Sequence, residues 1–116
     1  MEQPVRGGFA ATLSYFTLVG WAAAYFLHQR ERTALGAYHL RQTIFLYILS
    51  LSLFAIDAVL EVNPVDGWFL YPVLVGVSTT LFVLWLVGLV GALQGDIKPI
   101  PFIGKTAQEV FAGIAP

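Results

Sequence analysis

The chain has 116 residues, of which 58% are apolar and 11% are charged. Soluble domains are about 45–50% apolar and about 25% charged, so this balance indicates a protein that folds in lipid. The formal net charge is −1, and six Lys and Arg residues are too few to follow a phosphate backbone, which argues against a nucleic-acid partner. Cysteine is absent, which excludes disulfides, thiolate metal sites and cysteine nucleophiles.

Three apolar segments are long enough to cross a bilayer, whose hydrocarbon core of about 30 Å takes about 20 helical residues. They lie at about 9–27, 42–62 and 68–93. The second segment carries Asp57 and Glu61 near its end, and the other two carry no charge. Continuous apolar runs favour helices, because an isolated strand leaves its backbone unpaired in lipid. We therefore predict a single all-α membrane domain over 1–116 with three transmembrane helices.

The boundaries of these helices are marked by turn residues. Asn63-Pro64-Val65-Asp66-Gly67 predicts a turn, and Pro72 predicts that the third helix begins near Leu70, because proline is tolerated in the first turn. The third helix is expected to stop at Gly95-Asp96. After it, 104–114 has apolar residues at helical spacing and is too short to span, which predicts an amphipathic helix at the interface or against the bundle.

The distribution of basic residues predicts the orientation. With three spans, the first loop and the tail share one side, and they contain Arg30, Arg32, Arg41, Lys98 and Lys105. The opposite side has only Arg6. Cytoplasmic loops are enriched in Lys and Arg, so we expect the N-terminus outside and the C-terminus in the cytoplasm.

Small residues recur on the third predicted helix and suggest a packing seam for a partner helix or a second copy. They are Gly76, Thr80, Gly88, Gly91, Ala92 and Gly95. Small side chains let helix backbones approach closely in lipid. Glycine is also common in membrane helices generally, but we favour the packing role, with a neighbour inside the chain or outside it.

Asp57 and Glu61 share one face of the second predicted helix and form a candidate ion pathway. Ionisable groups inside a membrane are costly and often functional. However, Asp57 lies close to the helix end, and no Lys, Arg or His occurs in the other spans, so a hydrated structural role is favoured.

Tyr38-His39-Leu40-Arg41-Gln42 opens the second predicted helix, and His39, Arg41 and Gln42 are candidate contacts to a headgroup or a partner. The competing interpretation is an anchor without a specific ligand. Both fit residue chemistry equally well.

No catalytic motif is visible, and neither a cofactor nor a metal site is predicted. His28 and His39 lack a convergent carboxylate, and the serines in the apolar runs lack a nearby base. Gly104-Lys105-Thr106 resembles the end of a phosphate-binding loop, but Pro99 stands where that loop needs glycine. We therefore do not expect an enzyme.

Several short motifs together resemble a known family. They are Leu13-Ser14-Tyr15, Gly20-Trp21, Tyr38-His39-Leu40-Arg41-Gln42, Leu84-Trp85-Leu86-Val87-Gly88, Gly91-Ala92-Leu93-Gln94-Gly95 and Pro101-Phe102-Ile103-Gly104-Lys105. They are similar to small bacterial membrane proteins related to the chloroplast inner-envelope protein-import component (the Tic twenty-kilodalton subunit), a group that includes magnetosome-membrane proteins. The resemblance covers roughly Leu13 to Phe111 and implies a location in the bacterial inner membrane.

By this resemblance the motif positions are His39, Arg41, Gln42, Gly91, Gly95, Pro101 and Gly104, none of them catalytic in the family. The plastid member is implicated in moving proteins across a membrane, within a larger channel. Three expected spans instead of the plastid pattern of four argue against a self-contained channel in this chain.

Three functions follow as hypotheses. The leading one is a non-enzymatic accessory or scaffold component of a larger membrane assembly, such as a translocon-like one, with homo- or hetero-oligomeric partners. The alternative is a small oligomeric channel or transporter with Asp57 and Glu61 at its outer mouth. The third is an anionic-lipid-binding protein that uses Arg30, Arg32 and Arg41.

Overall fold

The computed structural model describes residues 7–63, 67, 69–97, 100 and 103–116. These residues form five helices, and none of them lies in a strand, so the all-helical prediction is confirmed. The helices are α1 (Gly8–Leu13), α2 (Thr17–Arg30), α3 (Ala34–Val62), α4 (Leu70–Gln94) and α5 (Gly104–Val110). Some residues used in the predictions lie outside the described ones, namely Arg6, Pro64, Val65, Asp66, Lys98, Pro99, Pro101 and Phe102.

Among the described residues, two helices, α3 and α4, are long and apolar enough to cross a membrane. At about 1.5 Å per residue, their 29 and 25 residues measure about 43 Å and about 37 Å. α3 begins earlier than predicted, because the Thr33 hydroxyl caps its first turn by accepting from the Gly36 N–H at 2.9 Å. A Cβ at Gly36 would stand 2.8 Å from His28 Nδ1, so glycine lets α2 pack closely there.

α4 begins at Leu70 and is closed by Gly95, the two positions at which the sequence placed its boundaries. Gly95 adopts a left-handed conformation with a φ of 72°. Its N–H donates to the Ala92 carbonyl at 3.1 Å, and the Asp96 N–H donates to the Gly91 carbonyl at 2.8 Å. This pair of bonds is a Schellman motif, which satisfies carbonyls that would otherwise be left open at the helix end.

The prediction of one continuous helix over 9–27 is wrong. The helix stops after Leu13, the N–H groups of Tyr15 and Phe16 close tight turns onto Thr12 and Leu13, and α2 starts at Thr17 with a φ of 62°. α2 has 14 residues, or about 21 Å, which is shorter than a bilayer core of about 30 Å. Three transmembrane helices are therefore not found among the described residues. Two helices, α3 and α4, are long and apolar enough to cross a membrane.

Distant side chains stabilise this break. The Tyr47 hydroxyl donates to the Ser14 carbonyl at 2.7 Å, and the Trp85 indole N–H donates to the Tyr15 carbonyl at 2.8 Å. A helix break leaves carbonyls without partners, and these are costly away from water. Here α3 and α4 each supply a donor, so the chain can turn without an orphaned carbonyl at either residue.

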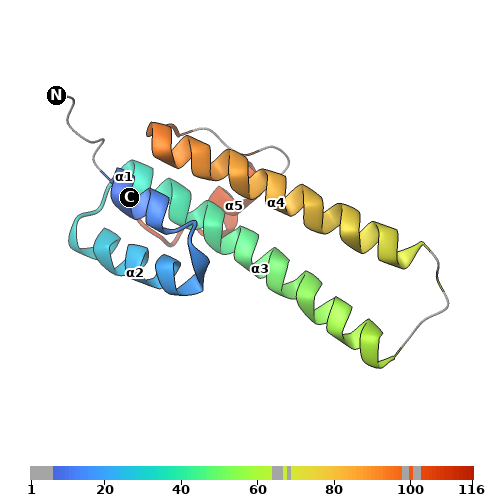
Figure 1. Ribbon diagram of the computed structural model, residues 1–116. Helices are drawn as coiled ribbons and strands as arrows, with labels where there is room; N and C mark the ends of the chain where they lie inside the picture. Colours follow the sequence, from blue (N-terminus) through green and yellow to red (C-terminus); the bar gives the residue numbers. More distant parts are fainter. Residues whose placement is uncertain (1–6, 64–66, 68, 98–99, 101–102) are drawn as a thin grey trace.

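The short helices gather at one end of the long ones (Figure 1). α1, α2 and α5 pack around the start of α3, and α1 also contacts α4, forming what we call the bundle. The remainder of α3 and α4 extends away as an arm, which gives the molecule extents of 57 × 24 × 23 Å. The buried apolar cluster lies at the bundle end and consists of Ala11, Tyr15, Leu35, Leu46, Leu84, Ala92 and Ile100.

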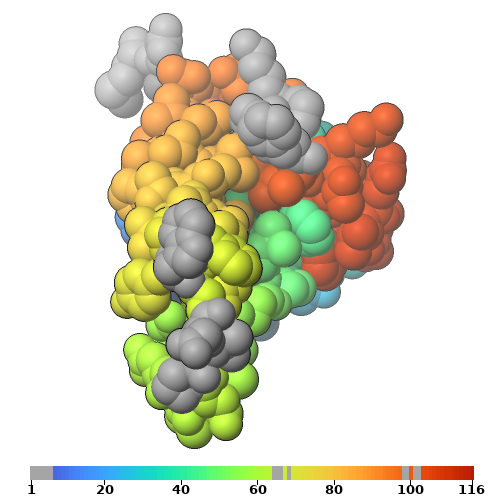
Figure 2. All heavy atoms as spheres, turned by 90° about the vertical axis from the view of Figure 1, so that its right-hand side faces the viewer, coloured from blue at the N-terminus to red at the C-terminus, as the bar shows by residue number. Residues whose placement is uncertain are grey.

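α5 is shorter than the predicted amphipathic segment, because it ends at Val110 and a turn follows. Seen along the arm from its tip, α5 and α4 lie on different sides of α3 (Figure 2). The tail thus folds back onto the bundle, one of the two placements that the sequence allowed.

Candidate functional site

A buried polar cluster lies where the hairpin of α1 and α2 meets α3. It consists of the side chains of Tyr15, His39 and Gln42, none more than 1% exposed. The Tyr15 hydroxyl lies 2.7 Å from His39 Nδ1, and Gln42 Nε2 donates to the same hydroxyl at 3.2 Å. The cluster ends on backbone groups of the segment after α4: His39 Nε2 lies 2.9 Å from the Asp96 carbonyl, and the Ile100 N–H donates to Gln42 Oε1 at 3.1 Å.

The two backbone groups fix the direction of each hydrogen bond. The Ile100 N–H can only donate, so Gln42 presents its oxygen there and its NH₂ to the hydroxyl of Tyr15. That hydroxyl then gives its single proton to His39 Nδ1. The Asp96 carbonyl can only accept, so His39 Nε2 carries the proton. This assignment leaves His39 neutral and every bond in the cluster made.

The hydrogen-bond directions also require Tyr15 to keep its phenolic proton, because His39 Nδ1 accepts it. Neither ring is charged, which suits a site enclosed by apolar side chains.

Glycines on α4 make room for this cluster. A Cβ at Gly88 would stand 2.6 Å from the Tyr15 hydroxyl oxygen, a distance that side chains do not tolerate. A Cβ at Gly91 would stand 3.7 Å from His39 Cε1, which is ordinary contact. Only Gly88 is therefore required by the space that Tyr15 occupies.

The predicted seam of small residues is divided between three environments. Gly88 and Ala92 are buried, with Gly91 beside them, so these positions pack inside the chain. Gly95 ends the helix. Gly76 and Thr80 lie on the arm, where a Cβ at Gly76 would meet nothing within 4 Å and the Thr80 hydroxyl donates to the Gly76 carbonyl at 2.9 Å.

The remaining predicted contact residue, Arg41, holds the tail. Its Nε and Nη2 donate to the Ile114 carbonyl at 3.0 and 2.6 Å, and its Nη1 donates to Gln108 Oε1 at 3.3 Å. Gln108 also donates to the Tyr38 carbonyl at 2.8 Å, and buried His28 bonds the Ala115 carbonyl at 2.6 Å through Nε2. Arg41, like His39 and Gln42, thus makes its described contacts within the chain.

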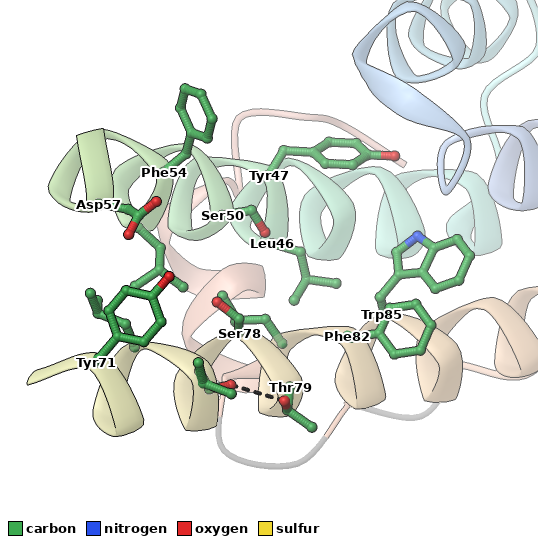
Figure 3. A pocket seen from close by; sticks show the side chains of 14 residues that line it. Leu46, Tyr47, Ser50, Phe54, Asp57, Tyr71, Ser78, Thr79, Phe82 and Trp85 are labelled. Atoms are coloured by element: carbon green, nitrogen blue, oxygen red, sulfur yellow. Dashed lines mark hydrogen bonds between the residues drawn. The ribbon is translucent and has the colours of Figure 1, made fainter. Parts of the chain in front are cut away.

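The arm contains a groove between α3 and α4, with a volume of about 590 Å³ (Figure 3). Its walls are mostly apolar, but Ser50, Asp57, Ser78 and Thr79 add polar groups along it. The Thr79 hydroxyl donates to the Val75 carbonyl of its own helix at 2.9 Å. Asp57 lies toward the tip of the arm and also lines a smaller recess with Glu61, of about 270 Å³. The predicted ion-pathway pair therefore lies at the tip end of the arm.

The chemistry available differs between these two places. None of the three side chains of the polar cluster lines the groove. Among the described residues, no group of three or more His, Asp and Glu side chains could hold a metal ion.

Comparison of the chain with protein-family models, with curated proteins and with solved structures finds no match. The family resemblance of the sequence accordingly stays a prediction.

Three residues that make the break and the cluster received no structural role from the sequence: Tyr15 and Trp85, which stand in the motifs of the family resemblance, and Tyr47. Each is an aromatic residue with a polar group, placed within an otherwise apolar run. Such a group needs a hydrogen-bond partner when it is buried, and this requirement is the signal that could have found them.

Proposed function

We propose that the chain is a non-enzymatic multi-pass membrane protein, held in the bacterial inner membrane by α3 and α4, that acts as an accessory or scaffold component of a larger membrane assembly, such as a translocon-like one. The observation that carries this proposal is the arm. Large apolar side chains stand exposed along both of its helices, among them Leu51, Phe54 and Val59 on α3 and Val73 and Phe82 on α4.

Exposed apolar surface of this extent favours lipid as the surroundings of the arm. The core helix of a soluble protein buries its apolar side chains, whereas α3 and α4 bury few of theirs beyond the bundle. In lipid, exposing these apolar side chains carries no free-energy penalty. Both helices are also long enough to cross the hydrocarbon core of a bilayer.

Association is supported by the face of α4 that turns away from the groove. Gly76, Thr80, Val83 and Val87 recur at intervals of three or four residues, which places them on one side of the helix. All four are exposed, and none lines the groove. Small residues let a second helix approach closely in a membrane, where close packing is the main source of affinity.

Gly76→Leu tests this proposal, because it fills the open position on that face. Cross-linking in native membranes followed by mass spectrometry should detect a complex with another membrane protein or a second copy, and Gly76→Leu should weaken it. Val59→Leu on the exposed outer side of α3 is the matched control and should leave it intact. A chain that remains monomeric and without partners in its native membrane contradicts the proposal.

A channel or transporter is the second candidate, and the groove is the observation that favours it. Its hydroxyls and Asp57 offer oxygen ligands between two apolar helices. Ion flux into liposomes that disappears in Asp57→Asn supports this alternative, and flux equal to that of empty vesicles removes it.

A further inference from the structure

We propose that α1 and α2 form a re-entrant hairpin, which enters the bilayer from the side of the basic residues and returns to that side, with lipid acyl chains covering its outer face. This inference rests on the proposed membrane location. It changes the topology predicted from the sequence, because the segment before α1 then lies on the same side as α5.

The two ends of the hairpin lie at the same level of the molecule. Gly7, at the start of α1, is in direct contact with Thr33, and any side chain at Gly7 would collide with it. Thr33 is also the N-cap of α3, only three residues after Arg30 closes α2. α1 therefore begins beside the start of α3, and α2 brings the chain back to the same level, where α3 begins.

The turn of the hairpin reaches only part of the way along the long helices. It is bonded to Tyr47, which lies 13 residues beyond Ala34 at the start of α3, or about 20 Å along the axis. On α4 it is bonded to Trp85, nine residues before the end at Gln94, or about 14 Å. A bilayer core is about 30 Å thick, so the turn stops short of its opposite side.

The backbone carbonyls of the turn are satisfied by side chains of the protein, as a position inside a bilayer requires. Irregular backbone at membrane depth is tolerated only where protein satisfies its polar groups. Tyr47 and Trp85 satisfy the carbonyls of Ser14 and Tyr15, while the Ser14 hydroxyl donates to the Ala11 carbonyl at 2.6 Å. A turn exposed to solvent would not need these donors.

The outer face of the hairpin is apolar, and its base is basic. Phe9, Val19 and Phe26 are 75%, 80% and 59% exposed. α2 then ends in Arg30, followed shortly by Arg32, at the level where anionic headgroups would meet it. This combination fits acyl chains along the hairpin and phosphate groups at its base.

The proposed topology also unites the basic residues of the chain. When only α3 and α4 cross, everything before α3 and everything after α4 shares one side. That side then holds all six Lys and Arg residues: Arg6, Arg30, Arg32, Arg41, Lys98 and Lys105. The opposite side, the loop between α3 and α4, holds none and carries Asp66. Three crossings would separate them five to one, so the hairpin gives the stronger basic bias expected of a cytoplasmic side.

Single cysteines can test this directly, because the natural chain has none to remove. Gln3→Cys precedes α1, Ala34→Cys stands exposed at the start of α3, and Val62→Cys stands exposed at its end. Each variant is incorporated into inside-out and right-side-out membrane vesicles and treated with a membrane-impermeant maleimide. The expected result is that Gln3→Cys and Ala34→Cys react in the same vesicle orientation, and Val62→Cys reacts in the other.

The other results separate the two proposals. If Gln3→Cys reacts together with Val62→Cys and opposite to Ala34→Cys, the hairpin crosses the membrane; the inference is then wrong while the membrane location stands. If all three react equally in both orientations, or the chain does not sediment with the vesicles, the membrane location itself is wrong and the inference falls with it.

Discussion

The hydroxyl of Tyr15 and Nδ1 of His39 lie 2.7 Å apart, although 24 residues separate them in the chain. Through this bond the turn of the hairpin is tied to the first part of α3, and through His39 and Gln42 it is tied to the segment that follows α4. Residues from three separate parts of the chain thus depend on one buried hydroxyl group.

Tyr15→Phe is expected to destabilise the bundle by about 1–3 kcal/mol, because it leaves His39 Nδ1 without its donor and Gln42 Nε2 without its acceptor in a buried place. The free energy of unfolding in detergent, from a denaturant titration, measures this loss. Tyr25→Phe is the matched control, since Tyr25 is 37% exposed. Equal stability of the two variants would show that the buried bonds contribute nothing.

Gly88→Ala and Gly76→Ala add the same methyl group to the same helix and should differ in sign. At Gly88 the added Cβ collides with Tyr15, so we expect a loss of about 1–3 kcal/mol from overpacking. At Gly76 the added Cβ meets nothing within the chain, and replacing glycine in a helix should stabilise by about 0.5–1 kcal/mol. Thermal unfolding in detergent distinguishes them; similar shifts in the two midpoints would refute the close approach of Tyr15.

Arg41→Gln is expected to release the tail, because its guanidinium donates hydrogen bonds to the Ala112 and Ile114 carbonyls and to Gln108 Oε1. Hydrogen exchange of the amides of α5 should accelerate, while the exchange of α4 should not change. Arg32→Gln removes the same charge from an exposed position and serves as the control. Unchanged exchange of α5 in Arg41→Gln would mean that His28 and apolar packing hold the tail without it.

The sequence made the two long helices predictable, since continuous apolar runs, Pro72 and Gly95 act locally. It also indicated the tail helix. The break after Leu13 could not be found in this way, because 14–17 contains neither proline nor glycine and the run stays uncharged. What permits the break is tertiary, since its donors come from Tyr47 and Trp85, 33 and 70 residues away from the carbonyls that they bind.

For the polar cluster, too, the sequence identified some of the residues but not the contacts that they make. The sequence selected His39 and Gln42 as polar groups at a helix start, which was sufficient to single them out. The sequence suggested a contact with a lipid headgroup or a partner, whereas in the fold both side chains bond the hydroxyl of Tyr15. Their direction depends on how α1 and α2 fold against α3, which is a property of the whole bundle and not of the motif.

The position of the arm relative to a bilayer can be measured with spin labels. Spin labels on single cysteines at Leu51 and Val62, both exposed on α3, report their access to oxygen and to a water-soluble nickel relaxant. Leu51 lies about midway between Arg41 and Val62, so it should show the highest ratio of oxygen to nickel access, with a lower ratio at Val62 near the tip. Equally high nickel access at both positions would place the arm in water and show that α3 and α4 do not lie in lipid.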